Sequence, residues 1–270
     1  MTRLLGVCTW ILGNPPLEAM ANRLVQIGYG GVELFGDWRK YPVQPTRQIL
    51  EKHRLSIFSF TPANVDLAHP CKIIRKKALT YYQRLLKYAA ALGGGIVSCH
   101  GKVGRIRPIS SQSSEERLFV EGVAILCEKA EKLGVKLALE VLNRYESHLV
   151  NTCAQALAIV KAIDSPALGI LLDTYHMNIE EQNFIKAIHT AKGKLLLFHV
   201  ADSNRLAPGR GHIPFAGLFT ALKEINYNGP IIIECTAPGP DPFTPRKGPN
   251  WEEAVWTELA IAVDVLRGML

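Results

Sequence analysis

The stretch LGILLDTYH at residues 168–176 carries the pattern that decides the fold, an apolar run that ends on a carboxylate, Asp173. A run that is continuously apolar predicts a strand buried on both faces, as in a parallel sheet covered by helices. An ionised side chain costs several kcal/mol to bury without a partner. We therefore expect Asp173 to stand at a strand end, where it serves a site.

Three further segments repeat this pattern. KLALEVL at residues 136–142 carries Glu140, LLLFHVAD at 195–202 carries His199, and PIIIECT at 230–236 carries Glu234. Each segment is an apolar run that ends near one ionisable group. Four consecutive predicted strands thus place an ionisable side chain near the same end.

Short apolar runs of this kind alternate with longer amphipathic stretches along the whole chain, in eight pairs. Apolar residues recur every three or four positions in the longer stretches, which is typical of helices that cover a sheet. The predicted strands are Leu4–Thr9, Gly31–Phe35, Leu55–Thr61, Gly95–Cys99, Lys136–Leu142, Leu168–Asp173, Leu195–Val200 and Pro230–Cys235. The predicted helices include Leu17–Ile27, Ile73–Ala91, Glu115–Leu133, Ala154–Ile163 and Trp251–Leu266.

Eight strand–helix units in 270 residues predict an α/β fold, a single (β/α)₈ barrel domain over residues 1–270. The alternative, a doubly wound open sheet, usually has fewer strands and often a glycine-rich phosphate loop after a strand. The three glycines at 93–95 precede a predicted strand instead. The barrel is therefore the favoured fold.

Composition excludes several classes of protein. Hydrophobic residues make up 48% and charged residues 20% of the chain, which is typical of a globular protein. No apolar run reaches the length of a transmembrane helix, and we interpret the apolar segment 4–12 as a buried strand instead of a signal peptide. The six cysteines include no CxxC pair, so we expect reduced thiols and a cytoplasmic location.

The net charge of +7 comes from 31 basic and 24 acidic residues. Much of the basic excess falls within one predicted helix, at Lys72, Arg75, Lys76, Lys77, Arg84 and Lys87. A solvated helix face explains such a cluster without a nucleic-acid or membrane partner, and we expect neither.

Barrel enzymes place their sites at the C-terminal ends of the strands. Glu140, Asp173, His199 and Glu234 would converge there as three carboxylates and one imidazole, which is a divalent-metal ligand set. These donors favour Mn²⁺ or Mg²⁺, with Co²⁺ as an alternative, over zinc. The competing interpretation is four separate buried ion pairs.

Glu140 and Glu234 come from predicted strands five and eight, so their carboxylates can face each other across a bound substrate. Such a pair suits removal of a proton from one face and its return on the other. Glu146, His176 and Arg205 lie just beyond the same strand ends. For His176 and Arg205, an ordinary surface-loop charge is the alternative interpretation.

Four segments together resemble the ketose 3-epimerases, the D-tagatose, D-psicose (D-allulose) and L-ribulose epimerases of the xylose isomerase-like sugar isomerase group. They are EVLNRYESHLVNT at 140–152, DTYHMNIEE at 173–181, HVADSNRLAPGRGHIPF at 199–215 and IIIEC at 231–235. The resemblance is close in the C-terminal half. In the N-terminal half it rests on the strand–helix rhythm and on GVELF at 31–35.

The resemblance implies a metal, usually Mn²⁺, at Glu140, Asp173, His199 and Glu234. It also implies that Glu140 and Glu234 are the acid–base pair, and that Glu146, His176 and Arg205 hold substrate oxygens. O2 and O3 of a ketose would bind the metal, one glutamate would remove the C3 proton, and the other would reprotonate the opposite face of a cis-enediolate. A sugar substrate and a homo-oligomer, dimer or tetramer, are implied as well.

The sequence departs from this family where the far end of a sugar would be held. The first predicted strand carries Gly6, Val7 and Cys8 in place of aromatic residues, which leaves Trp10 near the rim. The segment SCHGKVGRIRP at 98–108 has no counterpart in the pattern, so the roles of Cys99 and His100 stay open. The preferred sugar is accordingly undetermined at this stage.

Three other functions compete with the epimerase. An aldose–ketose isomerase, or a hydroxypyruvate- or inosose-type enzyme, would use the same metal and glutamates but shift the proton between C1 and C2. An endonuclease IV-like nuclease would fit the basic charge but needs several metal ions and many histidine ligands. A non-catalytic sugar-binding barrel conflicts with an intact acid–base pair.

Overall fold

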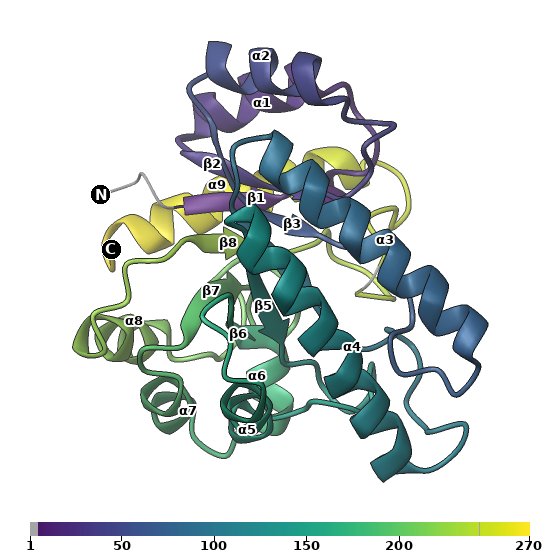
Figure 1. The fold of residues 1–270 in the computed structure, drawn as a ribbon. Coiled ribbons are helices and arrows are strands. Elements are labelled where there is room, and N and C mark those ends of the chain that lie inside the picture. Colours follow the sequence, from purple (N-terminus) through teal and green to yellow (C-terminus); the bar gives the residue numbers. More distant parts are fainter. Residues whose placement is uncertain (1–4, 243) are drawn as a thin grey trace.

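Eight parallel strands close into a barrel in chain order, each paired with the next and β8 paired with β1 (Figure 1). The computed structural model describes residues 5–242 and 244–270. The strands are β1 Leu5–Cys8, β2 Gly31–Phe35, β3 Ser56–Thr61, β4 Ile96–Cys99, β5 Lys136–Glu140, β6 Leu168–Asp173, β7 Leu195–Val200 and β8 Ile231–Ile233. The predicted (β/α)₈ barrel is confirmed; Leu4, the first residue of the first predicted strand, lies outside the described residues.

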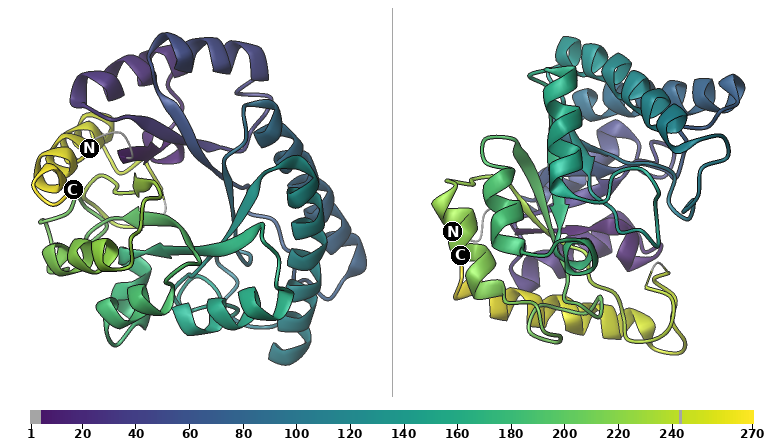
Figure 2. Two further views of the ribbon diagram at one scale, coloured as in Figure 1. Left: turned by 60° about the vertical axis from the view of Figure 1, so that its left-hand side comes forward. Right: turned by 90° about the horizontal axis from the view of Figure 1, so that it is seen from below.

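The helices form a ring outside the strands (Figure 2). They are α1 Leu17–Ile27, α2 Val43–Lys52, α3 Lys72–Ala91, α4 Gln112–Leu133, α5 Cys153–Ile163, α6 Thr174–Glu180, α7 Phe184–Thr190, α8 Phe215–Glu224 and α9 Trp251–Arg267, with a short 3₁₀ turn, η2, at Thr9–Leu12. The five helices named from sequence are all present. Helix α4 begins three residues before the predicted start because the Ser111 side chain caps it by accepting from the Ser114 amide.

Strands β5 and β8 end two residues earlier than predicted, and the difference affects the site. Strand β5 ends at Glu140 itself, and β8 ends at Ile233, one residue before Glu234. The apolar residues Val141 and Cys235, which extended the predicted runs, are buried in the loops instead. Both glutamates therefore stand at the C-terminal edge of the barrel.

No helix within residues 5–242 and 244–270 is long and apolar enough to cross a membrane.

A buried charge cluster ties three loops together at this edge. Arg105, in the loop between β4 and α4, forms ion pairs with Asp66 after β3, at 3.0 Å, and with Glu115 of α4. His148, after β5, lies 3.1 Å from the Glu115 carboxylate through its Nε2. These ion pairs fix the position of the β4–α4 loop. Val103 of the same loop also forms two backbone hydrogen bonds with the side chain of Asn64.

We expect Glu115→Gln to lower the free energy of unfolding by about 3 kcal/mol at pH 7, the scale of breaking a buried ion pair. Although burial opposes it, the Ser110 and Ile109 amides and Arg105 lower the pKa of Glu115 to about 2. Because the folded-state pKa is below the unfolded value, this stabilisation is complete above about pH 4.5 and is lost as the pH falls toward 2. Urea unfolding of both proteins at several pH values measures it.

The exposed neighbour Glu116 provides the matched control, since among the described residues its side chain bonds only to Gln112 on the same helix. Glu116→Gln should change the unfolding free energy by less than about 0.5 kcal/mol. A Glu115→Gln penalty that persists undiminished at pH 2 would contradict the assignment.

Candidate active site at the C-terminal edge of the barrel

A cavity of about 400 Å³ opens at the C-terminal ends of the strands. Its described lining residues are Trp10, Phe35, Thr61, Pro62, Asn64, His100, Val103, Glu140, Leu142, Glu146, His176, Arg205 and Glu234. Five of the seven site residues predicted from sequence are among them. The other two, Asp173 and His199, are at most 1% exposed and are not among these lining residues.

Three of the four predicted metal ligands meet in one group. Glu140, His199 and Glu234 each offer a ligand atom, and these atoms all lie within 4.8 Å of one another. The Nδ1 atom of His199 is 3.1 Å from the Glu234 carboxylate. Two oxygen donors and one nitrogen donor, all buried, fit a divalent cation.

Glu140 has no hydrogen bond or ion pair with any described residue, although it is only 8% exposed. Burial, together with the nearby carboxylates of Glu234, Glu33 and Asp173, raises its pKa well above the ordinary value. A buried carboxylate left without a positive partner is a place where a cation would be strongly favoured.

Glu234 has the opposite environment. Trp10 donates from its indole Nε1 to one carboxylate oxygen at 2.7 Å, and Arg205 lies 2.9 Å from the other. Although burial opposes it, the charges of Arg205 and His199 hold the pKa of Glu234 well below its ordinary value. The two glutamates thus have environments that push their pKa values apart, which is the arrangement expected of an acid–base pair.

Asp173, the fourth predicted ligand, lies beside this group but outside it. One of its oxygens accepts the Tyr175 amide at 2.7 Å and thereby caps α6. The other accepts the Arg205 guanidinium at 2.8 Å and lies 3.7 Å from Nε2 of His176. Its carboxylate is therefore engaged by Arg205, and its role as a ligand stays a prediction.

Arg205 connects Asp173 to Glu234. The residue has a positive φ of 63° and reaches into the barrel from the loop after β7. Asp202 organises this loop by accepting backbone amides, including those of Ser203 and Gly209. The guanidinium is 4.7 Å from the centre of the Tyr175 ring. The sequence predicts that Arg205 lies beside the ligands and holds substrate, and the structure pairs it directly with two of the predicted ligands.

Glu146 and His176 are joined through Asn143. The Asn143 amide group donates to Glu146 at 2.7 Å and lies 2.8 Å from Nδ1 of His176. The Asn143 backbone N–H also donates to the same Nδ1, at 3.3 Å. The same Nδ1 also lies 3.3 Å from the Glu146 carboxylate, and Nε2 is the ring nitrogen nearer Asp173.

The structure places the three residues whose roles the sequence did not assign. Trp10 lines the cavity and bonds Glu234, whereas Cys99 is fully buried and does not line it. His100 lines the cavity, and its Nδ1 lies 2.6 Å from the Gly101 carbonyl oxygen. Since a carbonyl can only accept, Nδ1 carries the proton, and Nε2 of the neutral ring is left as an acceptor.

Sequence reasoning missed one residue of the site, Glu33. It sits in the middle of β2, has no exposed surface, and lies 3.0 Å from Nε2 of His199. The signal was a carboxylate inside the apolar segment GVELF. The other site residues follow from ionisable groups at strand ends, whereas Glu33 stands inside its strand.

The family model for the xylose isomerase-like TIM barrel matches residues 21–257. The chain belongs to this family. A D-psicose 3-epimerase of Agrobacterium fabrum is 34% identical over 199 residues, 72% of this chain and 66% of that protein. An L-ribulose 3-epimerase of a Methylomonas species is 31% identical over 215 residues, 77% of this chain and 74% of that protein. The chain thus spans just under two thirds of the first relative and about three quarters of the second.

Solved structures agree with this assignment. The crystal structure of D-psicose 3-epimerase with D-tagatose from Clostridium cellulolyticum H10 superimposes with a TM-score of 0.86 and 25% sequence identity. The match covers 98% of this chain and 99% of that chain. The resemblance noted from four sequence segments is therefore confirmed at the level of the family, whose members named here are isomerase-class enzymes.

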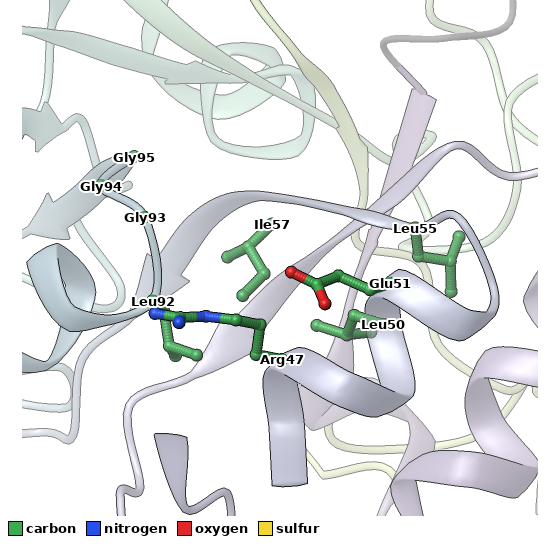
Figure 3. Close-up of a pocket in the computed structure, with 9 residues that line it drawn as sticks. All are labelled: Arg47, Leu50, Glu51, Leu55, Ile57, Leu92, Gly93, Gly94 and Gly95. Carbon is green, nitrogen blue, oxygen red and sulfur yellow. The ribbon is translucent and has the colours of Figure 1, made fainter. Parts of the chain in front are cut away.

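A second cavity, of about 350 Å³, lies at the other end of the barrel (Figure 3). It is lined by residues that precede or begin strands, such as Ile57 of β3 and the glycines 93–95 before β4. Its ionisable residues are Arg47, which donates to the Ala91 carbonyl, and the exposed Glu51. Barrel enzymes of this family type use the opposite end, so we place the chemistry at the C-terminal edge.

Proposed function

We propose that the chain is a metal-dependent ketose 3-epimerase that inverts C3 of a free ketose of the D-tagatose, D-psicose/D-fructose or L-ribulose type. One observation carries the proposal. Two buried glutamates from β5 and from the end of β8, Glu140 and Glu234, line one cavity and share a donor group with His199. The epimerase names of the relatives support the same reaction.

We propose Glu140, Asp173, His199 and Glu234 as the residues that would hold the cation. Mn²⁺ is our first choice, with Mg²⁺ or Co²⁺ as alternatives, because oxygen donors predominate. When bound, such a cation would polarise the substrate carbonyl and make the neighbouring C–H more acidic.

The chain's own carboxylates would then move the proton. One glutamate takes the proton from C3, the electron pair of the C–H bond moves into the C2–C3 bond of a cis-enediolate, and the other glutamate protonates C3 from the opposite face. We assign Glu234 as the base for one epimer and Glu140 for the other, with the roles exchanged in the reverse reaction. In each direction of the reaction, one glutamate thus acts as the base and the other as the acid.

The lining of the cavity favours a free sugar over a phosphorylated one. Among its described lining residues, Arg205 is the one lysine or arginine, and Asp173 and Glu234 already pair with it. A phosphate would need an unpaired cation or a set of backbone amides. Trp10, Phe35 and Leu142 instead offer apolar surface to the carbon skeleton.

Glu146, His176 and Arg205 are proposed to hold substrate oxygens beside the metal. A homo-oligomer and a cytoplasmic location stay predictions, from the resemblance and from the cysteine pattern respectively.

The deciding experiment is a panel of free and phosphorylated ketoses incubated with the protein and Mn²⁺, with the products separated by chromatography. We expect a free ketose to give its 3-epimer. An aldose product would assign the chain to the aldose–ketose isomerases, and exclusive turnover of phosphorylated sugars would contradict the assigned substrate class.

We expect His176→Ala and Arg205→Ala to raise KM at least ~10-fold, because each removes a proposed contact to a substrate oxygen, worth about 1.4 kcal/mol or more. Metal content should stay near one per chain in His176→Ala. Arg205→Ala should also lower the free energy of unfolding by about 3 kcal/mol, since it removes the buried guanidinium that pairs with both Asp173 and Glu234. Kinetics, elemental analysis and urea unfolding measure the three effects.

Arg144→Ala is the matched control. Arg144 is exposed and pairs with Glu180 outside the cavity, so its loss should change KM little. Loss of stoichiometric metal in His176→Ala would mean that the ligand set is wrong.

A further inference from the structure

We propose that Glu33 is a positioning residue that holds the proton of His199 on Nε2 and thereby keeps Nδ1 free to face Glu140 and Glu234. The inference rests on the proposed metal site, and it extends that site by one residue on the opposite wall of the barrel. Glu33 does not line the cavity, so it would act through His199 and not on the substrate.

The surroundings of Glu33 define it as a hydrogen-bond acceptor. One carboxylate oxygen accepts the Thr61 hydroxyl at 2.7 Å and lies 3.5 Å from the thiol of Cys8. The other accepts the Ser59 hydroxyl at 2.5 Å and lies 3.0 Å from Nε2 of His199. Each oxygen of Glu33 thus accepts a hydrogen bond from a hydroxyl group. Because an ionised carboxylate can only accept, its contact with Nε2 of His199 is a hydrogen bond when Nε2 carries the proton.

His199 lies between two carboxylates that come from β2 and from the end of β8, the two strands that flank β1. Its Nε2 faces Glu33 of β2, and its Nδ1 is 3.1 Å from Glu234, just beyond β8. A neutral imidazole has one N–H and one lone pair, and a proton kept on Nε2 leaves the lone pair on Nδ1. That lone pair then points into the group formed with Glu140 and Glu234, where a cation would need it.

Burying the Glu33 carboxylate costs free energy, which argues that this residue has a role in the site. Glu33 has no exposed surface and sits in the apolar segment GVELF, where a well-packed hydrophobic side chain would be expected to be neutral or stabilising. Strand β3 supplies two hydroxyls, Ser59 and Thr61, whose hydrogen bonds offset the cost of burying the carboxylate. Glu33, held in this way, would fix both the rotation and the tautomer of the His199 imidazole ring.

The first test compares the Mn²⁺ affinity of wild type, Glu33→Gln and Glu33→Asp by isothermal calorimetry on metal-free protein. We expect Glu33→Gln to weaken Mn²⁺ binding about 10–100-fold, the usual effect of removing a carboxylate behind a ligating histidine. Glu33→Asp keeps the charge and should recover part of that loss. Circular dichroism establishes that each variant is folded.

Glu258→Gln is the matched control. Glu258 is also a buried carboxylate, but it bonds the Ala207 amide and Arg210 away from the cavity. We expect it to lower thermal stability and to leave Mn²⁺ affinity unchanged. A folded Glu33→Gln that binds Mn²⁺ as tightly as wild type would overturn the inference.

A second measurement needs no Glu33 variant to fold. Nitrogen-15 shifts of the histidine rings in wild type loaded with Zn²⁺, a diamagnetic probe, report which ring nitrogen carries the proton. The His199 signal is identified by its loss in His199→Gln. A proton on Nε2 is expected, and a proton on Nδ1 would refute the inference. Wild type that binds neither Mn²⁺ nor Zn²⁺ would instead defeat the proposed metal site, so the two failures are distinguishable.

Discussion

Glu234→Gln should lower kcat for the preferred ketose by at least ~10²-fold, the usual scale for a positioned general base. Glutamine keeps the size of the side chain and an oxygen that can still accept from Trp10, but it cannot take a proton from C3. Arg205 keeps its second partner, Asp173, so the variant should fold. Glu140→Gln should cause a loss of similar size because a proton removed from one face must be returned on the other.

Deuterium exchange separates the two glutamates. In D₂O, wild type should place deuterium at C3 of the ketose. Glu140→Gln should still permit some exchange on the face served by Glu234 but yield little epimer. Glu224→Gln, a change at a surface residue that pairs with His189, is the control and should behave as wild type.

Two outcomes would revise this mechanism. Undiminished epimerisation in either glutamine variant would refute the two-carboxylate reaction. Deuterium at C1 or C2 together with an aldose product would identify the isomerase alternative.

Removal of divalent metal should abolish activity, and Mn²⁺ or Co²⁺ should restore it. Without a cation, Glu140 has no ion-pair partner among the described residues, and the nearby charge of His199 opposes the effect of three surrounding carboxylates. A bound cation would supply the missing positive charge. Asp173→Ala should lose metal, because Asp173 is one of the four proposed ligands. Activity and elemental analysis after exhaustive chelation measure both effects.

The metal-free protein should remain folded. Its barrel is packed with buried leucine, isoleucine, valine and phenylalanine, so the core does not depend on the site. Mn²⁺ at 100 times its Kd should raise the free energy of unfolding by about 2.7 kcal/mol, the linkage expected of a ligand that binds the folded state. Full activity of protein verified to contain no metal would contradict the site.

The strand order and the edge where polar groups gather could be predicted from local sequence. Continuous apolar runs ending on Glu140, Asp173, His199 and Glu234 identify parallel strands and their C-terminal ends. This works because the alternation of strand and helix is a property of neighbouring residues, and because a barrel leaves one end of every strand on the same side.

The pairings across the barrel could not be predicted in this way. Arg205 lies between Asp173 and Glu234, and Glu33 lies against His199, a residue 166 positions later in the chain. Such contacts depend on closing β1 against β8 and on the register that sets which side chains face inward. Local patterns carry the identity and direction of each strand, whereas the partners of a buried charge are decided only when all eight strands are in place.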